Sequence, residues 1–366
     1  MLAVIQSFGE ELPQACQNTC VEVWPVVESV MQNFGGLHYI SERSCGTLRL
    51  GLQFFGDAAL PVIPSVLGRL SGAFESSSHA SYIWILGKIV TRFGNEGTPI
   101  LRNSLRQSFE GVNAHLFGIL KMQSADTIPD GKGSLSIVAI LRLIFLLMVI
   151  VMEDYLHYLL RMLEFCPDLL FLSPSFPNTF RVVLSGLMLY QPDIIYPSLE
   201  FILNMLRHDC LTILNAAPGP SPPPNFPLYA AAIRGIIEEQ GFSLVGFLLA
   251  GMLSHFPEDS ISTVVTIFKI LAQVWPQQMV AWLPGASEHI PNASLPIESR
   301  RVFISDFTRC VIVLLEIRFT NTVAWVYIFY SSVASRQFDK VKQVILNLHR
   351  ASRRVRDRTR LTALDT

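Results

Sequence analysis

Short apolar helical faces that follow one another constrain the fold of this chain more than any other feature. They lie between Glu42 and Gly94, where proline, glycine and serine residues separate three segments. In each segment apolar residues recur at steps of three and four, which places them on one side of an α-helix. Short helices of this kind bury their apolar faces by stacking on neighbouring helices. The three sets are Cys45, Leu48, Leu52 and Phe55; Val62, Val66, Leu70 and Phe74; and Ile83, Leu86, Val90 and Phe93.

Similar segments recur along most of the 366 residues. Upstream, Trp24, Val27, Met31 and Phe34 have the same spacing. No stretch shows the sustained alternation and hairpin turns of paired strands. We therefore predict an all-α fold of the α-solenoid type, in which helix pairs stack in a row. Further helices are expected over residues 101–120, 154–165, 180–190, 195–206, 228–239, 244–255 and 260–274.

Two segments interrupt this pattern. Ala216–Pro227 contains six prolines, which exclude a helix and predict a linker or an exposed loop. Leu135–Met152 is apolar at every position except Ser136 and Arg142. Taken alone, it is long enough to cross most of a ~30 Å hydrocarbon core, so an integral membrane protein is the alternative prediction. A chain that exposes this apolar surface and does not fold stably is a third possibility.

Several blocks of the sequence resemble the carboxy-terminal part of a transportin-SR type nuclear import receptor, of the importin-β (karyopherin) superfamily, and fungal members in particular. They occur in the family's order from about Cys16 to the end of the chain. The blocks are Glu42-Arg43-Ser44-Cys45, Phe55-Gly56-Asp57-Ala58-Ala59-Leu60-Pro61, Ser81-Tyr82-Ile83-Trp84-Ile85-Leu86-Gly87-Lys88, Glu153-Asp154-Tyr155-Leu156-His157, Gln337-Phe338-Asp339-Lys340-Val341-Lys342 and Arg350-Ala351-Ser352-Arg353-Arg354.

The resemblance implies HEAT repeats, stacked as antiparallel helix pairs, and a receptor that shuttles between nucleus and cytoplasm. Its expected partners are Ser/Arg-rich or mRNA-binding cargo proteins and nucleoporins, with no direct nucleic-acid binding and no cofactor. The Ran GTPase binds mainly to an amino-terminal half that has no counterpart here, so the chain is expected to be a fragment. Contact with a membrane is expected only under the alternative prediction.

The resemblance also implies how the chain is divided. The family reads from an Ile-Pro-Asp turn into a Glu-Asp-Tyr-Leu-His helix, and removal of Gly131–Ile150 restores that junction. We therefore interpret residues 131–150 as an insertion, of the kind a translated intron leaves, and part of Ile317–Ser332 in the same way. The predicted divisions are HEAT-like repeats over 1–130 and 151–215, the proline-rich linker 216–227, and carboxy-terminal HEAT-like repeats with a basic tail over 228–366.

Two sets of arginines are candidate binding residues. In the family, one helix presents arginines towards phosphorylated Ser/Arg cargo, and Arg43 and Arg49 stand at matching positions, whereas Gly46 and Gln53 occupy two others. Six residues apart, the two arginines diverge by about 120° around a helix, so two solvated arginines remain an equal alternative. The second set is the basic patch Arg350, Arg353, Arg354 and Arg358, which we interpret as part of a last amphipathic helix that caps the solenoid, with nucleic-acid binding as the alternative.

Catalysis has little support in the sequence. The eight histidines are isolated, and no phosphate-binding loop or nucleophile elbow is present. Cys16 and Cys20 are one helical turn apart but lack a second Cys/His pair, so no zinc site is predicted. The six scattered cysteines are typical of reduced core residues in an intracellular protein. The sequence predicts a binding protein with no enzymatic activity, metal or cofactor.

Overall fold

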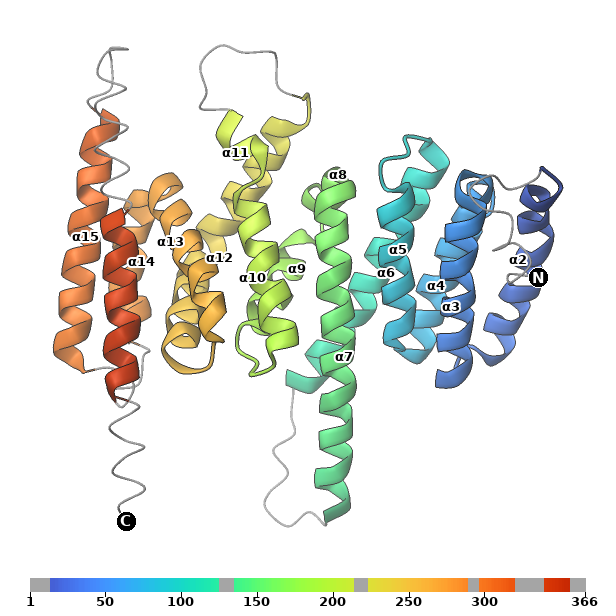
Figure 1. The fold of residues 1–366 in the computed structure, drawn as a ribbon, viewed down its shortest axis with the longest axis horizontal. Coiled ribbons are helices and arrows are strands. Elements are labelled where there is room, and N and C mark those ends of the chain that lie inside the picture. Colours follow the sequence, from blue (N-terminus) through green and yellow to red (C-terminus); the bar gives the residue numbers. More distant parts are fainter. Residues whose placement is uncertain (1–13, 125–134, 214–222, 289–295, 320–338, 356–366) are drawn as a thin grey trace. The chain divides into compact units, whose positions relative to one another are not determined.

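The structure is a computed structural model that describes residues 14–124, 135–213, 223–288, 296–319 and 339–355. Within these ranges the chain forms α-helices and two short 3-10 helices, and no strand. The helices pack as antiparallel pairs, which confirms the all-α, HEAT-repeat-like solenoid (Figure 1). The chain divides into two compact units, Met1–Thr179 and Phe180–Thr366.

The first unit consists of two layers of helices. Helices α2, α4 and α6 contact one another in sequence and form one layer, while α3, α5 and α7 form the other. Across the two layers, α2 packs on α3 and α4 packs on α5. The elements are α2 (Gln14–Phe34), α3 (His38–Phe55), η2 (Gly56–Ala59), α4 (Ile63–Ser77), α5 (Ala80–Phe93), α6 (Pro99–Ser124), α7 (Leu135–Phe165) and α8 (Pro167–Phe171), and the boundary between units falls within α9 (Phe176–Gly186).

The second unit is built in the same way. Helix α12 packs on α14, α10 packs on α13, and α15 packs on α14. A last helix over residues 339–355 follows in the sequence. The elements are α10 (Pro192–Leu206), α11 (Asp209–Ile213), α12 (Phe226–Ser254), η3 (Glu258–Ser260), α13 (Ile261–Val274), α14 (Pro276–Glu288) and α15 (Ile297–Phe319).

The periodic apolar residues of α4 and α5 form the core of the first unit. All four predicted residues of α5, and Val66, Leu70 and Phe74 of α4, are at most 3% exposed. Burying a side chain of this size stabilises the fold by roughly 1.5–3 kcal/mol. Helix α4 ends at Ser77, and the capping residue Ser78 that follows has a left-handed φ of 57°, so the helix does not continue. The predicted face of α5 is therefore confirmed, as is that of α4 except for Val62, which precedes the helix and is half-buried.

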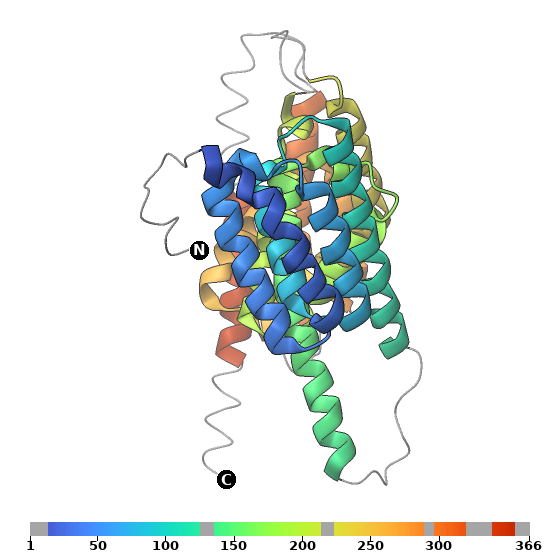
Figure 2. The same ribbon diagram turned by 90° about the vertical axis from the view of Figure 1, so that its right-hand side faces the viewer.

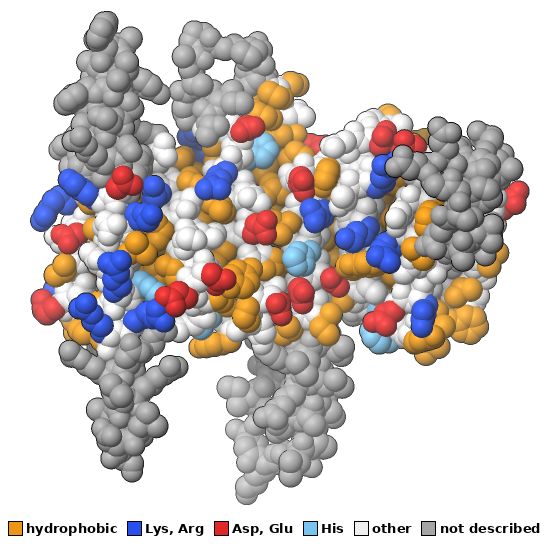
Figure 3. All heavy atoms as spheres, in the orientation of Figure 1, with side chains coloured by type: hydrophobic (Ala, Val, Ile, Leu, Met, Phe, Trp, Pro, Cys, Tyr) orange, Lys and Arg blue, Asp and Glu red, His pale blue; other side chains and the backbone are white. Residues whose placement is uncertain are grey.

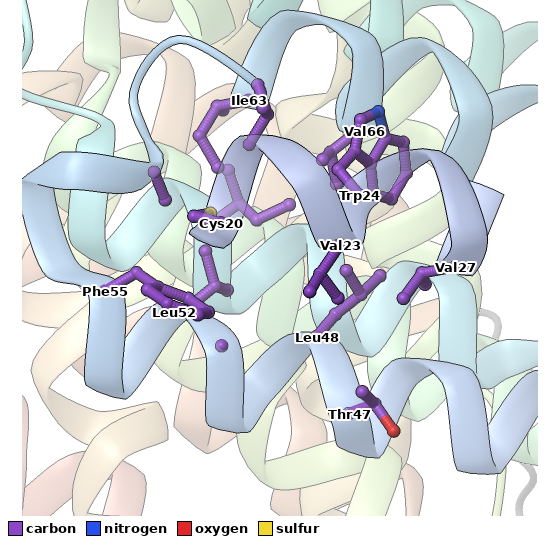
Figure 4. A pocket seen from close by; sticks show the side chains of 14 residues that line it. Cys20, Val23, Trp24, Val27, Thr47, Leu48, Leu52, Phe55, Ile63 and Val66 are labelled. Atoms are coloured by element: carbon purple, nitrogen blue, oxygen red, sulfur yellow. The ribbon is translucent and has the colours of Figure 1, made fainter. Parts of the chain in front are cut away.

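The first two helices are packed less completely than their periodicity predicts. Phe34, at the end of α2, is 54% exposed, so its prediction as a core residue is wrong. On α3 only Cys45 of the predicted face is fully buried. The other three residues line a cavity of ≈ 350 Å³ together with Val23 and Val27 of α2 (Figure 4). The spacing places these side chains on the correct face, but too few atoms lie opposite to cover them. The three residues are Leu48, Leu52 and Phe55.

Helix α12 is continuous, whereas the sequence predicts two helices over 228–239 and 244–255, and that prediction is wrong. Gly241, which lies in the predicted gap, is buried inside the helix against Trp282 of α14. A close interhelical contact therefore requires the glycine, and the chain does not turn there. Among the described residues, α12 is the one helix long and apolar enough to cross a membrane, and 56% of its most apolar window is buried inside the protein.

Helix α7 contains both the apolar segment Leu135–Met152 and the helix predicted over 154–165. Its 31 residues begin at Leu135, and its amino-terminal half extends past the ends of α5 and α6 (Figures 1 and 2). Ile150 is 52% exposed, whereas Val151 and Met152 are 4% exposed. Among the α7 residues whose side chains are described, full burial therefore begins at Val151. The last two residues of the predicted membrane segment Leu135–Met152 lie in the core of the first unit.

Candidate functional site

The layer of α3, α5 and α7 exposes a row of cationic and aromatic side chains. Arg43 and Arg49 are both exposed on α3, and the guanidinium carbon of Arg43 lies 5.2 Å from the centre of the Tyr39 ring. This contact across one helical turn orients Arg43 by cation–π attraction. Figure 3 shows Lys and Arg side chains gathered over this part of the surface. The structure thus places both predicted arginines in solvent on the same helix.

Helix α5 contributes a second cation and a second aromatic ring to this surface. Most of its residues are buried, but Trp84 is partly exposed and Lys88 is exposed one turn later. The Lys88 Nζ atom lies 5.7 Å from the centre of the Trp84 ring. The pair repeats on α5 the cation–aromatic arrangement of Arg43 and Tyr39 on α3. Sequence reasoning missed it, although a Trp and a Lys at i, i+4 in an otherwise apolar helix are a visible signal.

A hollow of ≈ 240 Å³ lies between α5 and α7. It forms beside Gly87, where a Cβ atom would be only 3.8 Å from the Tyr158 Cα atom, so the two helices approach closely. Its walls carry three basic or imidazole side chains and one carboxylate. The lining residues are Ile83, Trp84, Gly87, Lys88, Asp154, His157, Tyr158 and Arg161.

Asp154 is the acidic group of this hollow. Partial burial and, to a smaller extent, the neighbouring charge of Glu153 together raise the pKa of its carboxyl group to about 6. The carboxylate is therefore less stable than one in water, and an approaching cation would stabilise it. We define the cationic, aromatic and acidic side chains of this layer as the α3–α5–α7 face. Its members are Tyr39, Arg43, Arg49, Trp84, Lys88, Asp154, His157 and Arg161.

The α3–α5–α7 face combines groups that suit anions with groups that suit planar cations. Guanidinium and ammonium groups bind phosphates, and arginine does so with two parallel hydrogen bonds. A tryptophan ring beside a carboxylate suits an arginine side chain, which stacks on the ring while its nitrogens pair with the oxygens. The surface thus carries groups that can pair with anionic side chains and groups that can pair with cationic ones.

The second predicted patch lies on the last helix, which has the predicted amphipathic character. Val341, Ile345 and Leu348 are at most 3% exposed, and the Ser352 Oγ atom donates a hydrogen bond to the Leu253 carbonyl oxygen at 3.1 Å. These contacts attach the helix to the second unit. The predicted basic residues Arg350, Arg353 and Arg354 are exposed, and Arg358 lies outside the described residues.

The cysteines of the described part lie in the core. Cys20, Cys45, Cys166, Cys210 and Cys310 are buried thiols that form no disulfide. Burial raises the pKa of Cys45 to about 12 and that of Cys166 to about 11, so both remain protonated and unreactive near neutral pH. Among the residues whose side chains are described, no three His, Cys, Asp or Glu groups are arranged to hold a metal ion.

Comparisons with known proteins agree with the resemblance noted in the sequence. Residues 14–120 match the sequence profile of the Transportin-3/Importin-13 fourth TPR domain. An uncharacterized protein of Schizosaccharomyces pombe is 19% identical over 295 residues, which cover 79% of this chain and 28% of the yeast protein. A solved structure of Importin-13 in its cytosolic state covers 94% of this chain with a TM-score of 0.60 and 10% identity.

That alignment covers 32% of the Importin-13 chain, so this chain spans about a third or less of the length of the proteins it matches. The structural match shows the fold, and the profile match places a transportin-type repeat domain over the helices α2 to α6, including the arginines of α3. Together the comparisons support the resemblance of this chain to the importin-β family.

Proposed function

We propose that this chain is a cargo-binding segment of a nuclear transport receptor, and that its α3–α5–α7 face binds phosphorylated Ser/Arg-rich segments of cargo proteins. The observation that carries the proposal is the Trp84, Lys88 and Asp154 hollow, which lies in the same layer as Arg43 and Arg49. Phosphoserines would pair with the cations, and an arginine of the cargo would pair with Asp154 and stack on Trp84.

Binding to this face would be steeply dependent on salt, because its cations are exposed and screened by ions in solution. Two exposed arginines contribute modest energy, on the order of 0.2–1 kcal/mol each. The rigid helical surface adds specificity, since the cargo segment orders on a surface that is already formed. The receptor would act by binding, without chemical transformation of its cargo, and would shuttle between nucleus and cytoplasm.

The first test measures the affinity of a fluorescent, phosphorylated Ser/Arg peptide for the full chain and for the Arg43→Ala/Arg49→Ala variant. We expect the variant to bind about tenfold more weakly, from the loss of two charge-assisted contacts. The control is Arg301→Ala, because Arg301 is a similarly exposed arginine of α15 that pairs within its own helix with Glu298. Equal affinity of the double variant and the wild type would remove Arg43 and Arg49 from the site.

Regulation by Ran is proposed to require more than this chain. Release of cargo on binding of Ran-GTP needs two shapes of the receptor with different affinities for cargo. We expect no measurable complex between this chain and Ran-GTP in titration calorimetry. A nanomolar complex would contradict the assignment of the main Ran site to a segment absent from this chain.

We further propose that residues 131–150 are an insertion into a repeat of the first unit. The proposal is supported by the described side chains of α7, among which Ile150 is half exposed, whereas Val151 and Met152 are buried. Membrane insertion of the projecting half of α7 is the alternative function. Extraction with alkaline carbonate distinguishes the insertion from the membrane span. A chain that spans the membrane remains in the pellet, whereas a peripheral or soluble chain is released.

A further inference from the structure

A second groove lies in the other unit, between α13 and the helix over residues 339–355. It has a volume of ≈ 560 Å³ and is separate from every residue of the α3–α5–α7 face. We call it the basic groove, because its walls carry four Lys or Arg side chains and one carboxylate. It is lined by Glu258, Ile261, Ser262, Val265, Thr266, Lys269, Lys342, Leu346, His349, Arg350 and Arg353.

The two helices run antiparallel along the basic groove. Arg353 forms an ion pair with Glu258, so the end of the last helix lies beside the start of α13. Lys269 and Lys342 line the groove farther along both helices. From Glu258 to Lys269 the groove extends for about 16 Å at ~1.5 Å per helical residue. This length matches about five residues of an extended peptide at ~3.3 Å each.

The floor of the basic groove is apolar, and its rim is cationic. Ile261 and Val265 are 4% and 3% exposed and form the floor with Leu346. Lys342 and Arg350 are exposed at the rim. Figure 3 shows Lys and Arg side chains concentrated on this end of the second unit, over the orange and red helices of Figure 1.

The cations of the rim are not needed to hold the last helix in place. The buried residues Val341, Ile345 and Leu348 and the hydrogen bond from Ser352 to Leu253 provide that attachment. Like charges placed along one groove repel one another, and Glu258, the carboxylate among the lining residues, pairs with Arg353 and not with the exposed Lys342 or Arg350. An anionic ligand would relieve this repulsion.

We propose that the basic groove binds an acidic peptide segment of a partner protein, with its carboxylates on Lys269, Lys342 and Arg350 and an apolar side chain on the floor. Charge complementarity and the apolar floor carry this proposal together. A single-stranded nucleic acid fits the groove less well, because no Phe, Tyr or Trp ring lines it for stacking of bases and the His349 ring is buried. The proposal goes beyond cargo binding at the α3–α5–α7 face, which uses other residues.

The structure provides a matched control for this site. Arg354 is exposed and adjacent to Arg353 in the sequence, yet it does not line the basic groove. The sequence pattern groups Arg350, Arg353 and Arg354 into one patch, whereas the groove includes the first two. Arg350→Gln and Arg354→Gln therefore remove the same charge from the same helix, inside and outside the site.

The experiment measures binding of a fluorescein-labelled hexapeptide of alternating Glu and Leu to the full chain by fluorescence anisotropy. The same peptide with Gln for Glu, and a labelled uridine hexanucleotide, are the comparison ligands. We expect the Glu peptide to bind, with an affinity that falls as salt rises. Lys342→Gln/Arg350→Gln is expected to weaken it by about tenfold, and Arg354→Gln by no more than about twofold.

Three results would overturn the proposal: no binding of the Glu peptide, equal binding of the Gln peptide, or tighter binding of the hexanucleotide. Equal losses in the Arg350 and Arg354 variants would show a diffuse charge effect and would also overturn it. If the double variant does not fold, Lys342→Gln alone repeats the test, because Lys342 is an exposed side chain. Trp84→Ala is expected to leave this binding unchanged, so failure here and failure of the cargo proposal are distinguishable.

Discussion

The Nζ atom of Lys88 lies 5.7 Å from the centre of the Trp84 ring, one turn earlier on the same helix. This pair and Asp154, which lies across the hollow on α7, come from segments about 70 residues apart in the sequence. The pair positions a cation beside an aromatic surface, and Asp154 adds a carboxylate. Binding of cargo at the α3–α5–α7 face depends on this arrangement.

The first prediction concerns Trp84. Replacing it with alanine removes the stacking surface and weakens binding of a phosphorylated Ser/Arg peptide by about fivefold to tenfold, the range of a partly exposed cation–π contact. Titration of the labelled peptide by anisotropy measures the change. Tyr190→Ala is the matched control, because Tyr190 is a 74% exposed aromatic residue of the second unit. Equal losses in both variants would contradict a specific role for Trp84.

The second prediction concerns pH. The pKa of Asp154 is raised to about 6, so its carboxylate becomes available to a guanidinium as the pH rises through 6. Affinity for an unphosphorylated, arginine-rich peptide should therefore increase between about pH 5 and 7, and Asp154→Asn should remove this increase. His157 lines the same hollow, so His157→Gln is the control, and this variant should keep the increase.

The same pKa has a consequence for stability. A carboxyl group whose pKa is higher in the folded than in the unfolded state binds more protons when folded, so stability falls as the pH rises from about 4 to 6. Urea unfolding of wild type and Asp154→Asn at both pH values measures the effect. The wild type should lose stability relative to the variant on going from pH 4 to 6. A relative gain would contradict the assigned environment of Asp154.

The fourth prediction compares two glycines of α12. At Gly241 a Cβ atom would lie 2.3 Å from Cη2 of the Trp282 ring, whereas at Gly235 no atom lies within 4 Å. Gly241→Ala should therefore destabilise the second unit by about 1–3 kcal/mol, the usual cost of overpacking. Gly235→Ala should stabilise it by about 0.5–1 kcal/mol, because alanine favours the helix. Denaturant unfolding measures the free energy of unfolding of both variants. Equal destabilisation by the two substitutions would contradict a continuous α12 packed on α14.

The fifth prediction concerns the insertion. Deleting Gly131–Ile150 removes the half of α7 that extends beyond its neighbours and retains the packed residues from Val151 onward. The shortened chain should unfold cooperatively and bind the phosphorylated Ser/Arg peptide as the full chain does. It should also aggregate less, because the deletion removes an apolar run. Loss of cooperative unfolding would show that these residues are part of the fold.

The sequence predicts well those helices that are buried by their immediate neighbours. Phe74 and Phe93 follow the helical period and are completely buried, because helices on both sides cover them. Phe34 follows the same period but is exposed, since periodicity identifies a face and does not show whether another helix covers it. Gly241 led to a wrong helix boundary, because the reason for that glycine is a tryptophan about 40 residues away.

The sequence identified the exposed arginines of the two candidate sites but not the hollows that lie beside them. Arg43, Arg49, Arg350 and Arg353 were identified from the resemblance and from charge clustering, and all are exposed. The hollow with Asp154 and the basic groove with Lys269 were not predicted. Each is formed by two helices that are distant in the sequence, so neither is visible in a local pattern of residues.

Photo-crosslinking tests the central claim most directly. A phosphorylated Ser/Arg peptide with a photoreactive group is bound to the full chain, irradiated, and its crosslinks are mapped by mass spectrometry. Crosslinks within α3, α5 and the packed part of α7, lost on competition with unlabelled peptide, are the predicted result. Crosslinks confined to α13 and the last helix, or spread over the surface without competition, would contradict cargo binding at the α3–α5–α7 face.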